Sequence, residues 1–234
     1  YLRKGEFGLR RSILRVVPFA IVLLLCFVAS PAPQAAAASS GYDVVSAEPV
    51  MHAGMHIIFD RTAAGASTGA KWHVTVQSVS YPKWVEISWV WPRSDGTLPA
   101  ATIRRINGLE RGRTFGPVFG VRDPIDTDNT APWVSREVLR ELRTGRVAYN
   151  FKMGSVSLTG ILAGDLNVEE EVLFPVDLNG RRVFLPAYKC AKGQLTIWNN
   201  MQNPLVLEYR PIGVPLITGV FGWKAESVSI RGEV

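Results

Sequence analysis

The stretch FPVDLNGRRVFLPAYKC (174–190) predicts a β-hairpin. Asn179-Gly180 is a strong signal for its turn, because both central positions of such a turn need a positive φ. Apolar residues alternate toward one face on either side of it: Phe174, Val176 and Leu178 before the turn, and Val183, Leu185 and Ala187 after it. Pro175 and Pro186 each lack a donor for the strand ladder, which predicts edge positions.

Short apolar runs separated by turn residues fill the chain before this hairpin as well. HIIFD (56–60) predicts a strand, and RTAAGASTGA (61–70) predicts a flexible loop because its small residues offer nothing to bury. Residues 71–80 and 83–92 both alternate, so we expect them to form an antiparallel pair joined through Tyr81-Pro82. Asn107-Gly108 predicts a further hairpin.

One helix is expected near 131–144, where apolar residues recur at helical spacing. Asn129 or Thr130 could cap its start, with Ser135 as the alternative, and Gly145 suits the residue after its end. Strands are expected again after the helix, at 146–153, 155–163, 166–174, 174–178, 181–188, 193–199, 204–210 and 216–230, the last bending near Gly219 and Gly222.

The whole pattern amounts to roughly ten strands and one amphipathic helix. It predicts a mainly β fold, an antiparallel sandwich or partly closed barrel. No fixed-period repeat and no composition break marks a second domain, so residues 41–234 are expected to form one β-rich domain.

The segment 1–38 has the layout of an export signal: a basic start, an uncharged run from Val16 to Ser30, and an Ala-rich end. The apolar run is shorter than the roughly 20 residues of a spanning helix, which favours a cleaved signal. RRSILR (10–15) resembles the twin-arginine export pattern, and a general secretion signal is the alternative. Both routes predict a periplasmic or secreted protein that contacts the membrane only through its signal.

The net charge and the cysteine count argue against nucleic-acid binding and against a disulfide. The segment 1–38 carries +4 of the net charge of +6, so the rest of the chain offers no strong basic surface for nucleic acid. Cys26 lies in the signal, which leaves Cys190 alone and excludes a disulfide within the mature chain. We expect Cys190 to be a free, partly buried thiol and not a nucleophile, because no base is placed near it in the sequence.

The three histidines are grouped with two methionines near one predicted strand. Thioether and imidazole groups suit copper, so one hypothesis is a copper site built from Met51, His52, Met55, His56 and His73. The alternative is surface histidines near a strand start. No other cofactor is indicated.

Tryptophans and arginines supply the ligand-binding candidates. Trp89 and Trp91 are expected in the core, whereas Trp84 points to the other face and could stack on a ligand. Arg104, Arg105, Arg111, Arg113 and Arg122 could form a basic patch or protect an edge strand. The predicted ligand-binding residues are therefore Trp84, Arg104, Arg111 and Arg113.

No catalytic motif is present, and the carboxylates of VEEEV (168–172) read as a solvated strand face. The leading expectation is an exported, non-catalytic protein that binds a ligand, an envelope polymer, lipid or an envelope protein. One alternative is a hydrolase acting on envelope or extracellular polymers, because acids drawn from distant strands leave no local trace. The copper-binding protein is the other alternative.

Overall fold

A computed structural model describes residues 43–44, 49–92, 97, 100–116, 128–153, 162–211 and 221–229. Contacts between Cα atoms divide the chain into two units, Tyr1–Ser40 and Gly41–Val234, and the described residues all belong to the second. The predicted export signal, Arg122, Gly219 and most of the strand predicted at 155–163 lie outside them. No helix among the described residues has both the length and the apolar character needed to cross a membrane.

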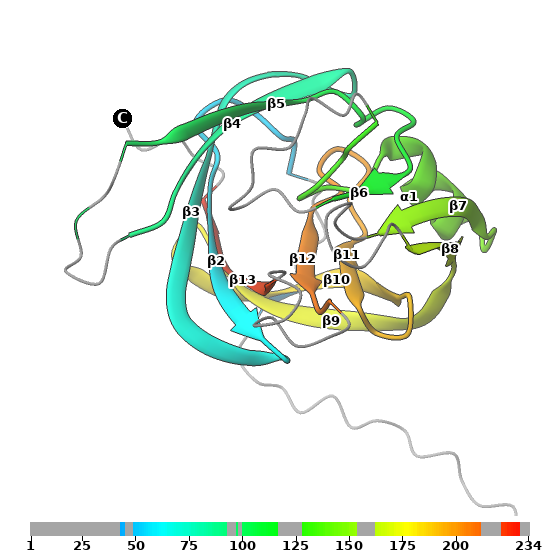
Figure 1. Ribbon diagram of the computed structural model, residues 1–234. Helices are drawn as coiled ribbons and strands as arrows, with labels where there is room; N and C mark the ends of the chain where they lie inside the picture. The colour runs from blue at the N-terminus through cyan, green and yellow to red at the C-terminus, as the bar shows by residue number, and fades with distance from the viewer. Residues whose placement is uncertain are drawn as a thin grey trace, which may run out of the picture. The chain divides into compact units, whose positions relative to one another are not determined.

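The described chain is mainly β with one helix, as predicted (Figure 1). Its elements are β1 (Asp43–Val44), β2 (His56–Ala63), β3 (Ala66–Ser80), β4 (Trp84–Val90), β5 (Thr102–Ile106), β6 (Thr114–Phe115), α1 (Arg136–Arg143), β7 (Ala148–Met153), β8 (Leu162–Leu166), β9 (Val168–Leu178), β10 (Arg181–Cys190), β11 (Leu195–Trp198), β12 (Val206–Tyr209) and β13 (Gly222–Ser229).

A closed ring of five strands lies within a ten-stranded sheet. Strands β9, β10, β11, β12 and β13 pair in chain order, and β13 also pairs with β9, which closes the ring. Along one edge of β13, the first residues pair with β12 and the later ones pair with β9. The other edge of β13 pairs with β2. From there β2–β5 continue as an antiparallel sheet, and β6, β7 and β8 form a second, three-stranded sheet on the same side as α1 (Figure 1). The fold is thus a partly closed barrel.

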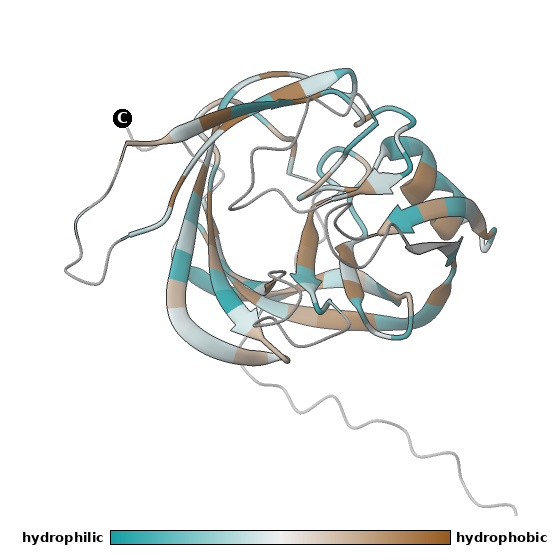
Figure 2. Cartoon of the chain, in the orientation of Figure 1, coloured by the Kyte–Doolittle hydropathy of each residue, from teal (hydrophilic) through white to brown (hydrophobic). Residues whose placement is uncertain are grey.

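Hydrophobic and hydrophilic residues alternate along the strands, and the hydrophobic ones form the core (Figure 2). On the sheet β2–β4, one face buries Ile57, Phe59, Trp72, Val74, Val76, Val85 and Ile87. We call this face the inner face of the sheet. The opposite face, which carries His56, His73 and Trp84, is called the outer face.

The hairpin at 174–190 is confirmed. Asn179 and Gly180 have φ values of 50° and 76°, and Leu178 pairs with Arg181 across the turn. The two strands predicted at 166–174 and 174–178 are one strand, β9. The edge prediction is wrong for β10, which has β9 on one side and β1 and β11 on the other. Pro186 fits there because it lies between the residues paired to β1 and those paired to β11, where a missing donor costs nothing.

The loop predicted at 61–70 is wrong. β2 continues to Ala63 and β3 starts at Ala66, so the turn is only Ala64 and Gly65, with φ values of 50° and 83°. The β2–β3 ladder continues into this segment although its side chains are not buried, because small polar side chains form hydrogen bonds across it. Ser67 Oγ donates to Asp60 Oδ1 at 2.8 Å, and Thr68 Oγ1 donates to the Arg61 carbonyl at 3.0 Å.

The hairpin predicted at Asn107-Gly108 is also wrong. β6 pairs with β7 and not with β5, and the chain after Gly108 makes one helical turn, in which Gly112 N donates to Gly108 O at 2.7 Å. Gly108 is needed for a different reason than a positive φ. A Cβ there would lie 2.7 Å from the carbonyl oxygen of Asp128.

The helix is confirmed but is shorter than predicted. Ser135 is its N-cap, and Ser135 Oγ accepts from Val138 N at 3.3 Å. The Asn129 side chain instead accepts from Gly116 N and Ala131 N. Gly145, at φ 70°, ends the helix with the two hydrogen bonds of a Schellman motif: Gly145 N to Leu142 O, and Arg146 N to Glu141 O.

Candidate functional site

The five residues of the predicted copper site fall into three groups. Met51 and Met55 are buried in the core, and Met55 Sδ accepts a hydrogen bond from Asn203 Nδ2 at 3.4 Å. His56 and His73 lie on the outer face with ring centres 5.4 Å apart. His52 Nδ1 lies 2.7 Å from its neighbour's carbonyl, Ala53 O. In the part of the chain that the structure describes, no three His, Cys, Asp or Glu side chains are grouped to hold a metal.

Trp84 and Arg104 are not brought together. Arg104 pairs with Ile87 and therefore faces inward, whereas Trp84 lies on the outer face. Trp84 is instead covered by Arg105, whose guanidinium carbon is 4.1 Å from the ring centre. Arg105 Nε also lies 4.0 Å from a Glu86 oxygen, so this arginine already has a carboxylate.

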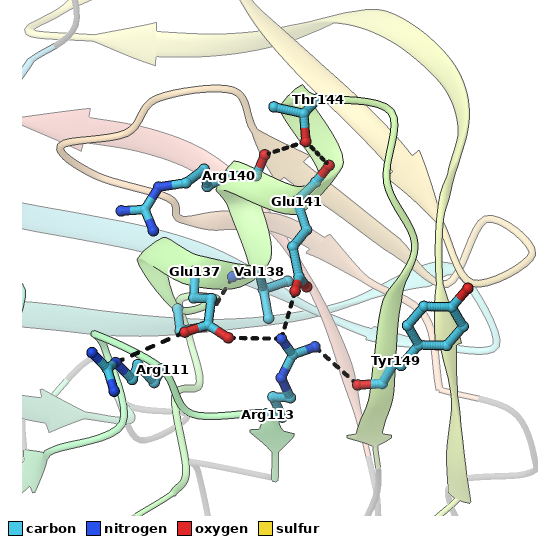
Figure 3. Close-up of polar contacts among 9 residues, drawn as sticks. Arg111, Arg113, Glu137, Val138, Arg140, Glu141, Thr144 and Tyr149 are labelled. Carbon is cyan, nitrogen blue, oxygen red and sulfur yellow. Dashed lines mark hydrogen bonds and ion pairs between the residues drawn. The ribbon is translucent and has the colours of Figure 1, made fainter.

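Arg113 binds the carboxylates of α1 (Figure 3). Its Nη2 donates to Glu137 at 2.9 Å and to Glu141 at 2.7 Å, and its Nη1 donates to the Tyr149 carbonyl at 2.9 Å. The hydrogen bond to Glu141 is the largest cause that raises the pKa of Arg113. Arg111 Nε lies 3.9 Å from Glu137. Arg113 therefore links α1 to the chain before β6, whereas the Arg111 side chain is 80% exposed.

Cys190 is a free cysteine, and its side chain is fully buried. Burial, with a smaller effect of the Glu169 charge, raises the pKa of this thiol to about 12. The thiolate that a nucleophile needs is thus absent at neutral pH. Glu169 accepts hydrogen bonds from the backbone amides of Lys192 and Gly193, and Glu170 pairs with Lys189 at 2.7 Å. These two exposed glutamates of β9 therefore contact β10 and the turn that follows it.

A different group comes together on the inner face, around Arg61 of β2. Its guanidinium carbon lies 4.1 Å from the centre of the Trp91 ring and 4.4 Å from the centre of the Phe221 ring. Its Nε donates to Thr68 Oγ1 at 3.1 Å. The planar cation is therefore held between two rings and fixed by one hydrogen bond at the end of the β2–β3 hairpin. We call Arg61, Trp91 and Phe221 the arginine clamp.

The aromatic core supports the clamp from behind. Trp72 meets Trp91 edge to face at 6.3 Å and Trp223 at 6.2 Å. Trp223 pairs with Arg61 across β13 and β2 and is itself buried. Trp91 packs against this core, as predicted, but remains half-buried. The ring that covers Arg61 is thus positioned by rigid neighbours.

The electrostatics of Arg61 differ from those of Arg105 and Arg113. Burial between the rings lowers the pKa of Arg61, and no carboxylate acts in the opposite direction. Among the described residues, no ion pair involves Arg61, whereas Arg105 pairs with Glu86 and Arg113 pairs with Glu137 and Glu141. Arg61 is a partly desolvated cation whose Nε is hydrogen-bonded to Thr68.

No local pattern in the sequence indicated Arg61 as a site residue. It fell in a segment that we expected to be a loop, and its second ring, Phe221, comes from the other end of the domain. The alternation of 83–92 placed Trp91 with the core correctly, but nothing paired it with an arginine. No family model, curated protein or solved structure matches this chain.

Proposed function

We propose that the protein is an exported, non-catalytic binding protein that holds an anionic group of an envelope polymer or smaller ligand at the arginine clamp. The supporting observation is Arg61 between Trp91 and Phe221 without a carboxylate partner among the described residues. A guanidinium presents a planar pair of donors that matches a carboxylate or a phosphate.

The two rings explain why this arginine suits binding better than an exposed one. They remove water from both faces of the guanidinium, and a charge interaction strengthens as the surrounding dielectric falls. Thr68 occupies Nε, which leaves the two terminal nitrogens to meet both oxygens of one anionic group. The ordered rings also reduce the entropy lost when the ligand binds.

Binding is tested with the purified protein by following tryptophan fluorescence during titration. The probes are polygalacturonate for carboxylates, polyphosphate for phosphates, and neutral dextran. We expect saturable binding of at least one anionic polymer and none of dextran. Arg61→Gln should weaken that binding at least tenfold, and Arg61→Lys should fall between, because it keeps the charge but loses the planar donor pair.

Arg105→Gln is the matched control, since Arg105 also stacks on a tryptophan but has the Glu86 carboxylate nearby. It should bind like the unmodified protein. Equal losses in the Arg61 and Arg105 variants would show a general charge effect and contradict the proposal, as would equal binding of dextran. Circular dichroism confirms that each variant is folded.

Export is tested separately by fractionating cells that produce the full chain. Recovery of the protein only from the cytoplasm would contradict export. Replacing Arg10 and Arg11 by lysine distinguishes the routes, because the twin-arginine route depends on both arginines and a general secretion signal needs only positive charge.

A further inference from the structure

His56 and His73 are diagonal neighbours on the outer face of β2 and β3. His56 pairs with Thr75, and His73 pairs with Ile58, two residues further along the ladder. Side chains at such diagonal positions of adjacent strands are within reach of each other. The residues that alternate with the histidines are buried in the core, so the strand backbone fixes both imidazoles on the same face.

The spacing of the rings suits a shared metal ion. A metal lies about 2.0–2.1 Å from an imidazole nitrogen, which puts the ring centre about 3.2 Å from the metal. Two such rings in tetrahedral or slightly wider arrangement are about 5 Å apart from centre to centre. The observed separation is 5.4 Å, with the ring planes inclined by 37°.

We propose that His56 and His73 bind one divalent ion of the first transition row, with water completing the coordination. Imidazole is a good ligand for copper, nickel and zinc, and copper(II) is the strongest binder of the series. The structure gives no third protein ligand within the described residues, so the ion is exchangeable.

This site differs from the five-residue copper site that the sequence indicated. Met51 and Met55 are buried in the core, and the proposed site does not include them. The proposal is also independent of the arginine clamp, which lies on the opposite face of the sheet and is built from other residues.

The charges around the histidines favour a cation on balance. Lys71 is next to the pair on β3, but Glu226 at 2.7 Å and Asp60 at 3.7 Å neutralise it and leave one negative charge in excess. Burial lowers the pKa of His73, and the charge of Glu226 acts in the opposite direction with a smaller effect. A metal binds only neutral imidazole, so binding should weaken at acid pH, where the imidazoles are protonated.

The test is titration of the purified protein with copper(II), nickel(II) and zinc(II), each without other ligands, by calorimetry. Electron paramagnetic resonance of the copper(II) form should show coupling to two nitrogens. His56→Thr and His73→Thr should each lower copper affinity at least tenfold, and threonine keeps the strand propensity of both positions.

His52→Thr is the control, because His52 lies outside the pair and its ring is next to its own backbone. It should leave copper affinity and the two-nitrogen signal unchanged. An equal loss in the His52 variant would overturn the proposal. Binding of the His56→Thr/His73→Thr double variant as tightly as the unmodified protein would overturn it too, and circular dichroism checks that both variants keep the native sheet.

Discussion

The indole nitrogen of Trp133 donates a hydrogen bond to the side-chain oxygen of Asn203 at 2.8 Å, across 70 residues of sequence. The amide nitrogen of the same side chain donates to Met55 Sδ at 3.4 Å. Asn203 is completely buried. One amide therefore joins the segment before β2 to the segment before α1.

Replacing Asn203 by leucine should lower the free energy of unfolding by about 3 kcal/mol, because the buried indole nitrogen of Trp133 loses its acceptor and gains no water. Chemical denaturation measures the change. Gln202→Ala is the control, since the hydrogen bonds of Gln202 run through its backbone. A cost for Asn203→Leu no larger than for the control would show that the bridge carries little stability.

Cys190 should make the protein less stable at alkaline pH. The unfolded thiol titrates near 9 and the folded one at about 12, so raising the pH through this range releases a proton only from the unfolded state and favours unfolding. Between pH 8 and pH 10 the loss should be about 1.4 kcal/mol. Cys190→Val should remove this part of the pH dependence, whereas Tyr209, whose pKa burial also raises to about 12, contributes equally to both proteins. Identical pH profiles would contradict the assignment.

Lys192→Gly should raise the free energy of unfolding by about 1 kcal/mol. Lys192 has a φ of 57° between two other residues of positive φ, Ala191 and Gly193, and glycine adopts this conformation without strain. The hydrogen bond from its backbone amide to Glu169 is kept. Lys83→Gly, at an exposed turn position without positive φ, should bring no gain when thermal unfolding is compared.

Gly108→Ala should destabilise the protein by about 1–3 kcal/mol, although Gly108 has no positive φ. The added Cβ would meet the carbonyl oxygens of Asp128 and Asn129 at 2.7 and 2.8 Å, and neither can move without shifting the backbone. Gly164→Ala is the control, because a Cβ there meets nothing within 4 Å. Thermal unfolding that affects both variants alike would show that the close approach is relieved cheaply.

The two Asn-Gly pairs show what the sequence could predict about the fold. At Asn179-Gly180 the flanking residues alternate over long runs, and pairing them buries one face of each strand, so local turn signal and burial agree. At Asn107-Gly108 the turn signal is the same, but Leu109 and Phe115 are buried against other parts of the chain. Packing between residues distant in sequence determined that only the first pair forms a hairpin turn, and no local sequence pattern indicates such packing.

The candidate sites show the same limit. Alternation correctly placed Trp84 and Trp91 on opposite faces of the sheet. The pairing of Arg113 with Glu137 and Glu141 could not be predicted, because these carboxylates are on α1, distant in sequence. Arg61 was missed because its segment looked too small and polar to be ordered, although a ladder of backbone hydrogen bonds needs no apolar side chains.

The position of β13 has a consequence for how the chain acquires its structure. This strand pairs with β2, β12 and β9, so the closing contacts join residues near both ends of the domain. Contacts of such long sequence separation slow folding, because the entropy of closing a large loop is lost before the contact forms. A chain still emerging from the ribosome cannot close its ring until residues 222–229 are free, and until then the edges of β2, β9 and β12 stay open to chaperones.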